Sequence, residues 1–212
     1  MTPSDAAFPD ERFCRFAGVL ARAVAVVGLA YSVAFVLYLK SGGKAAATAS
    51  AAFLLIGSLL ATPVLVATYV RLRRGGPAFA LWALLVALVS AVGSAIHGAF
   101  DLVNLVNPPS RGPGDLPNAV DPRGLLTFAM AGLGVAALAW LILRTGLLPR
   151  RVGTLAGVLG VALVLIYLGR LIILNPKNPL LLGIAAITGL VLNPLWWIWL
   201  GAELRRTGPT DV

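Results

Sequence analysis

Six long runs of apolar residues constrain the fold of this chain more than any other feature. Each run holds 18 or more residues and is bounded by charge or by proline and glycine. A helix of that length spans the hydrocarbon core of a bilayer, which is roughly 30 Å thick. Backbone polar groups find no water there, so each crossing segment must be helical. The sequence therefore predicts an all-α fold, a polytopic transmembrane helical bundle that occupies residues 1–212 as one domain. The six expected helices lie near residues 16–39, 46–70, 78–106, 124–143, 153–174 and 179–202.

The composition excludes an ordinary soluble domain. Apolar residues make up 59% of the chain and charged residues only 12%, against roughly 45–50% and about 25% in a typical soluble protein. The formal net charge is +9, but the basic residues sit in short clusters between the apolar runs. A nucleic-acid binder needs a continuous solvated basic face instead. We expect the lipid bilayer to be the main partner and expect no nucleic acid.

The basic clusters also predict an orientation. Ten lysines and arginines lie in the two tails and in the second and fourth connections, whereas six lie on the opposite side. Cytoplasmic segments carry the excess of Lys and Arg in membrane proteins, so both termini are expected in the cytoplasm. Tryptophans near the same side are expected to act as interface anchors: Trp140, Trp196, Trp197 and Trp199.

The third connection, residues 107–123, contains five prolines and faces the opposite, extracytoplasmic side in this orientation. Proline fixes φ and removes a hydrogen-bond donor, so regular structure is not expected there. This Pro/Gly-rich loop is either a semi-rigid cap or a plain spacer.

The third helix carries a stripe of polar residues at spacings of four, three, four and three. At 3.6 residues per turn these side chains share one face, and that face must point away from lipid. Polar groups at membrane depth are costly, so they are functional candidates by default. The stripe consists of Ser90, Ser94, His97, Asp101 and Asn104.

Arg170, near the outer end of the fifth helix, is the expected partner of this stripe. We predict an ion pair between Asp101 and Arg170 with His97 beside it. Read functionally, the cluster is an outward-facing site that binds protons or an anion. Read structurally, it is a buried network that locks the third helix to the fifth. Arg170 can instead extend its head group to the outer lipid surface.

Two further features are an expected ion pair between the first and last helices and a proline inside each of the second and last helices. Arg22 and Glu203 both lie near the cytoplasmic side, and we expect them to form a structural pair that holds the first helix against the sixth. Pro63 and Pro194 lie well inside their spans and are candidate kinks. Interrupted helices can mark a transporter's substrate site, but a proline kink alone produces the same pattern.

Established catalytic patterns are missing from the sequence. One histidine excludes a bis-histidine haem within one chain, and Cys14 has no C-x-x-C partner. His97 and Asp101 supply only two metal ligands, whereas zinc wants a third. The segment from His97 to Asp101 resembles the H-x-x-x-[ND] motif of CAAX-type intramembrane proteases, but the glutamate pair and second histidine of those enzymes have no counterpart. We expect no cofactor, no metal and no enzymatic activity.

The last third of the chain, from Leu147 to Arg206, shows a loose resemblance. It combines Leu-Pro-Arg-Arg-Val-Gly, Tyr-Leu-Gly-Arg-Leu and Asn-Pro-Leu-Trp-Trp-Ile-Trp-Leu-Gly, followed by an arginine pair. In these segments it resembles small, uncharacterised six-helix membrane proteins of bacteria. The resemblance implies a bacterial plasma membrane and no particular activity.

Two functional hypotheses follow from the sequence. The leading one is a non-catalytic accessory or interaction subunit, which associates with another membrane protein or with copies of itself. The alternative is a small carrier or channel whose outward-facing polar site uses His97, Asp101 and Arg170. A carrier should contain a cavity that reaches the polar stripe, whereas a packed subunit should not.

Overall fold

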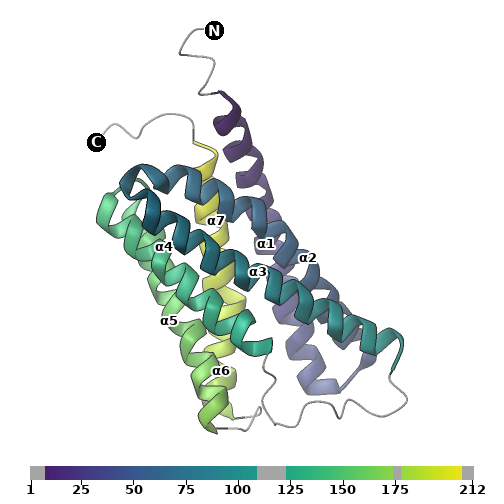
Figure 1. Ribbon diagram of the computed structural model, residues 1–212. Coiled ribbons are helices and arrows are strands. Elements are labelled where there is room, and N and C mark those ends of the chain that lie inside the picture. The colour runs from purple at the N-terminus through teal and green to yellow at the C-terminus, as the bar shows by residue number, and fades with distance from the viewer. Residues whose placement is uncertain (1–7, 109–122, 174–177, 207–212) are drawn as a thin grey trace.

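A computed structural model describes residues 8–108, 123–173 and 178–206, with side chains from residue 11 onward. All regular structure in these ranges is helical (Figure 1). Six helical segments are long and apolar enough to cross a membrane, which confirms the expected six-helix bundle. The residues of the third connection from 109 to 122 lie outside the described ranges, so its role as a cap or spacer stays a prediction. The elements are α1 (Phe8–Ser41), α2 (Lys44–Leu72), α3 (Pro77–Val106), α4 (Ala131–Thr145), α5 (Arg150–Ile173), α6 (Pro179–Ile187) and α7 (Asn193–Leu204), with α6 and α7 in one span.

The helices form an antiparallel bundle in which neighbours in sequence pack together. α1 packs against α2, α2 against α3, and α4 against both α3 and α5. α7 returns to α1, which closes the first helix onto the last span. The start of α1, the end of α7 and the α2–α3 and α4–α5 turns lie at one end of the bundle, which we call the terminal end (Figure 1). Toward the opposite end, the distal end, α2 and α3 diverge from α5 and α6 (Figure 1).

Two spans are interrupted by short π-helical segments. The segment η2 (Leu125–Met130) precedes α4, and the segment η3 (Thr188–Leu192) separates α6 from α7. Pro194 accounts for the second one, because proline has no N–H and its ring clashes with the carbonyl four residues earlier. That carbonyl belongs to Leu190, inside η3. Pro63 differs, since it lies inside α2, which runs as an α-helix from Lys44 to Leu72.

Contacts at the terminal end replace the expected Arg22–Glu203 pair. Glu203 is buried, and its carboxylate accepts hydrogen bonds from Arg151 at 2.8 Å and from Arg206 at 2.9 Å. Arg71 donates to the backbone carbonyls of Leu204 and Arg206. Arg22 is exposed on α1. The prediction of that pair was therefore wrong: Glu203 pairs with Arg151 at the start of α5 and with Arg206 just after α7.

Glycines allow α4 and α5 to approach backbone to backbone. A Cβ added at Gly160 would lie 2.8 Å from the carbonyl oxygen of Gly132 and 2.9 Å from the nitrogen of Ala136. A Cβ added at Gly132 would lie 2.6 Å from the carbonyl oxygen of Gly160. Small residues are the usual means of close helix contact in membranes. The pair Gly132 and Gly160 therefore fixes the distance between α4 and α5.

We expect Gly160→Ala to lower the free energy of unfolding by about 1–3 kcal/mol, because the added methyl group forces two backbones apart. Gly157→Ala is the matched control on the same helix, since its Cβ would meet only the Ala139 methyl at an ordinary 3.8 Å. The control should be neutral or slightly stabilising, because alanine favours helix more than glycine does. Thermal unfolding of both variants in detergent checks the difference. Equal midpoints would contradict the close approach.

Candidate ligand-binding cavity

A cavity of about 250 Å³ lies inside the bundle. Residues from α1, α2, α3, η2, α4, α5 and the whole α6–η3–α7 span line it, so every membrane-crossing span contributes. Phe35 of α1 and Leu182 of α6 line it and are 37% and 36% exposed. The cavity therefore reaches the outer surface of the bundle, where that surface is apolar. A molecule dissolved in a bilayer can enter such a site from the side.

Most of the lining is apolar, with neutral polar groups set into it. Two of the predicted stripe residues, Ser90 and Ser94, line the cavity and are 4% and 7% exposed. No aspartate, glutamate, lysine, arginine or histidine belongs to the lining among the residues that the structure describes. The neutral polar residues of the lining, apart from the aromatic ones, are Ser32, Ser58, Ser90, Ser94, Thr127, Thr188 and Asn193.

Two lining residues carry buried polar atoms without a hydrogen-bond partner in the protein. They are the hydroxyl oxygen of Thr188 and the indole nitrogen of Trp196. The two residues are 3% and 1% exposed. A buried donor or acceptor left without a partner costs about 1–3 kcal/mol. Native proteins therefore satisfy nearly all such groups, and each exception needs an explanation. Among the described residues a third such atom, Nε of Arg71, lies at the terminal end, whereas Thr188 and Trp196 share one helical span and both line the cavity.

Three other helical hydroxyls show what Thr188 lacks. Ser32, Ser58 and Thr68 each donate to the carbonyl oxygen four residues earlier, at 2.7–3.0 Å. This local bond satisfies a serine or threonine inside an apolar helix. Thr188 opens the π-helical segment η3, and its hydroxyl makes no such bond. The Thr188 hydroxyl therefore lacks the local partner that these three hydroxyls have.

Both π-helical segments contribute to the cavity. Thr127 and Phe128 come from η2, and Thr188 and Gly189 come from η3. Single-turn π segments inside helices occur frequently at functional sites, because the extra residue redirects side chains and backbone groups. The segments of the fourth and last spans that depart from the α-helix thus form walls of the cavity.

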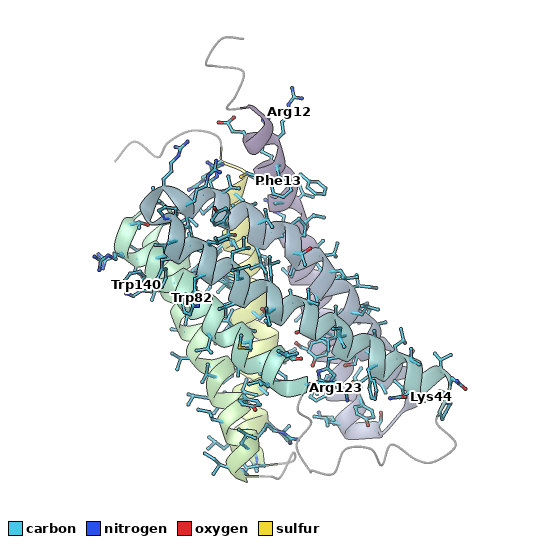
Figure 2. The ribbon with its side chains drawn as sticks, viewed as in Figure 1. Arg12, Phe13, Lys44, Trp82, Arg123 and Trp140 are labelled. Carbon is cyan, nitrogen blue, oxygen red and sulfur yellow. The ribbon has the colours of Figure 1, made fainter. Side chains whose placement is uncertain are left out.

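A polar cluster lies at the distal end, next to the cavity. The guanidinium of Arg123 donates to the carboxylate of Asp101 at 3.0 Å and stacks over the ring of Phe100 at 4.1 Å. The Nε2 atom of His97 lies 3.5 Å from the same carboxylate, and its Nδ1 atom lies 2.9 Å from the hydroxyl of Thr127. Figure 2 shows Arg123 in the half of the bundle away from Arg12.

Thr127 connects this cluster to the cavity, because it lines the cavity and bonds His97. Its hydroxyl also lies 3.2 Å from the carbonyl oxygen of Arg123, to which it donates. When His97 carries a proton on both nitrogens, Nδ1 donates to Thr127 and the threonine proton points to Arg123. When Nδ1 is unprotonated it accepts the threonine proton instead. Whether Nδ1 of His97 carries a proton therefore sets the direction of a hydroxyl in the cavity wall.

The predicted pairing of Asp101 with Arg170 was wrong. Asp101 pairs with Arg123, while Arg170 lies half-buried near the end of α5. The expected contact of His97 with Asp101 is present. Asn104 continues the stripe beyond Asp101 and does not line the cavity. The structure thus divides the stripe into two cavity serines and a distal ion cluster that Arg123 completes.

Because Asp101 pairs with Arg123 and not with Arg170, substituting the two arginines should change the free energy of unfolding by different amounts. Arg123→Gln should lower the free energy of unfolding by about 1 kcal/mol, because it removes a partly exposed ion pair and a cation–π contact. Arg170→Gln should change it by less than about 0.5 kcal/mol. Thermal unfolding in detergent, with Asp101→Asn in a double-mutant cycle, checks both values. A measurable coupling of Asp101 to Arg170 and none to Arg123 would contradict the assignment.

Two cavity residues were missed or misread in the sequence. Trp196 and Trp197 are 1% and 8% exposed, so their expected role as interface anchors was wrong, whereas Trp140 is 46% exposed (Figure 2). Trp197 instead donates to Asn193 at 3.0 Å. The signal that pointed to this region was the Asn-Pro interruption of the last span.

Comparisons with protein-family models, with curated proteins and with solved structures found no match to this chain.

Proposed function

We propose that this protein is a non-catalytic, multi-pass protein of a bacterial plasma membrane that holds a small molecule in its intramembrane cavity. The observation that carries the proposal is the pair of orphaned buried polar atoms on Thr188 and Trp196, both in residues that line the cavity. A ligand that bonds these atoms would supply hydrogen bonds that no protein group gives them. Among the described residues the lining holds one titratable side chain, that of Tyr31, and no acid–base pair, which favours binding over catalysis.

The proposed orientation places both termini in the cytoplasm. It is supported by the excess of Lys and Arg in the tails and in the α2–α3 and α4–α5 connections. In that orientation the distal end, with Asp101 and Arg123, faces outward. The bilayer is the first partner of the chain, and the protein acts by itself or as the ligand-binding subunit of a membrane complex.

A second candidate function, a proton-linked carrier, is favoured by one contact. Thr127 bonds His97 and also lines the cavity, so a proton on His97 changes the hydrogen-bonding character of the cavity wall. Histidine is the side chain that titrates near neutral pH. Transport that requires a pH gradient, and loses this requirement in His97→Gln, would favour the carrier.

The proposed function is tested by filling the cavity. Ser94→Phe places an aromatic ring in the cavity, whereas Val92→Phe places the same ring on the exposed face of α3, where Val92 is 51% exposed. Each protein is expressed in a bacterial membrane and purified, and its bound small molecules are extracted and quantified by mass spectrometry. We expect a molecule near one equivalent per chain in the wild type and in Val92→Phe, and its loss in Ser94→Phe. Equal recovery of all extracted molecules from the three proteins would overturn the proposal.

A further inference from the structure

We propose that the ligand of the cavity is an uncharged, elongated and largely apolar molecule that carries oxygen acceptors, such as ketone or alcohol oxygens, at separate positions for Trp196 and Thr188. This inference rests on the proposed function and names its ligand class. Three properties of the cavity support it: its lack of charge, the type of its orphaned groups, and their separation.

The absence of charge in the lining excludes an ionic ligand. Among the residues that the structure describes, the lining holds no Asp, Glu, Lys, Arg or His. Burying an ion without a partner in a low-dielectric site costs many kcal/mol in free energy. The Asp101–Arg123 pair lies outside the lining and its charges compensate each other. A neutral molecule is the class that the cavity can hold.

The orphaned groups require an acceptor atom. The indole nitrogen of Trp196 is a donor only, while the hydroxyl of Thr188 donates or accepts. An atom that satisfies Trp196 must therefore be an acceptor, and a carbonyl or hydroxyl oxygen is the neutral group that serves. A second oxygen of the same kind, at another position on an elongated molecule, satisfies Thr188 when the threonine donates.

The position of the two groups sets the shape of the ligand. Thr188 and Trp196 are eight residues apart in one span, which corresponds to roughly 12 Å along a helix at 1.5 Å per residue. One compact molecule does not reach both. The cavity also opens to the apolar outer surface beside Phe35 and Leu182, so an elongated molecule dissolved in the bilayer can enter from the side.

The test uses three probes with the same chain length: 2-dodecanone, dodecane and ionised dodecanoate. The full chain, with ¹⁵N-labelled tryptophan, is placed in nanodiscs and titrated with each probe. The indole N–H signal of Trp196 is assigned from Trp196→Phe, and that of Trp82, which is 51% exposed, is the lipid-facing control. The variant Thr188→Val/Trp196→Phe removes both orphaned groups. Methyl signals of cavity residues report binding in the variant.

We expect 2-dodecanone to shift the Trp196 signal and to bind about fivefold more tightly than dodecane, as one neutral hydrogen bond provides. Dodecanoate should leave the Trp196 signal in place. In the double variant the ketone and the alkane should bind alike, and that residual binding shows that the cavity persists. Binding of dodecanoate as tight as that of the ketone, or equal binding of ketone and alkane to the wild type, would overturn the ligand class. Failure of every probe to move any cavity signal would overturn the proposed function itself.

Discussion

Replacing Arg151 and Arg206 together by glutamine is expected to lower the free energy of unfolding by about 3–5 kcal/mol. The two arginines are the partners of the Glu203 carboxylate, whose side chain is 2% exposed while theirs are 54% and 60% exposed. Removing both cations leaves a buried negative charge without compensation. Thermal or chemical unfolding in detergent measures the loss.

The Glu203 side chain is buried whereas both arginines are more than half exposed, and this difference predicts the effect of the control substitution Glu203→Gln. Glu203→Gln alone should cost less than the double arginine variant, because the freed arginines can turn to water while a stranded carboxylate cannot. Adding Glu203→Gln to the double variant removes the buried charge, so the triple variant should regain most of the lost stability. A triple variant as unstable as the double one would show that Arg151 and Arg206 act through packing alone.

Thr188→Val is expected to raise the free energy of unfolding of the ligand-free protein by about 1–2 kcal/mol. Valine has nearly the shape of threonine, and the substitution removes a buried hydroxyl that has no partner. Most substitutions in a buried helix destabilise, so a gain at this position is diagnostic.

Thr68→Val is the matched control for this prediction. Thr68 is also a buried threonine in a helix, but its hydroxyl donates to the carbonyl oxygen of Val64 at 2.8 Å. Losing that bond should cost about 0.5–1 kcal/mol. Unfolding of both variants, measured after delipidation in detergent, gives the comparison. Destabilisation by Thr188→Val of the same size as by Thr68→Val would mean that the Thr188 hydroxyl has a partner, and the case for a ligand at that position would fail.

The number and class of the helices could be predicted from the sequence because hydrophobic length is a local property. Each span needs about 20 apolar residues in a row, and no tertiary information is required to count them. The inward orientation of Ser90 and Ser94 could also be predicted from helical periodicity, because a stripe of polar residues must face away from lipid.

Pairing between helices could not be predicted in the same way. Asp101 was matched to Arg170 by depth alone, yet the lateral order of the helices decides which cation is near, and Arg123 at the start of the fourth span lies closer. Glu203 was matched to Arg22 for the same reason, while α5 brings Arg151 to it. The burial of Trp196 depends on the rotation of α7, which the π segment before Pro194 alters.

The central claim is that the cavity holds a ligand bonded to Thr188 and Trp196. An experimental map of the protein in lipid nanodiscs, at a resolution that shows side chains, tests it most directly. We expect elongated non-protein density in the cavity, within hydrogen-bond distance of the Trp196 indole nitrogen or the Thr188 hydroxyl. A closed cavity, with the Thr188 hydroxyl bonded to the carbonyl of Ile184 and the Trp196 nitrogen bonded to a protein oxygen, would contradict the claim.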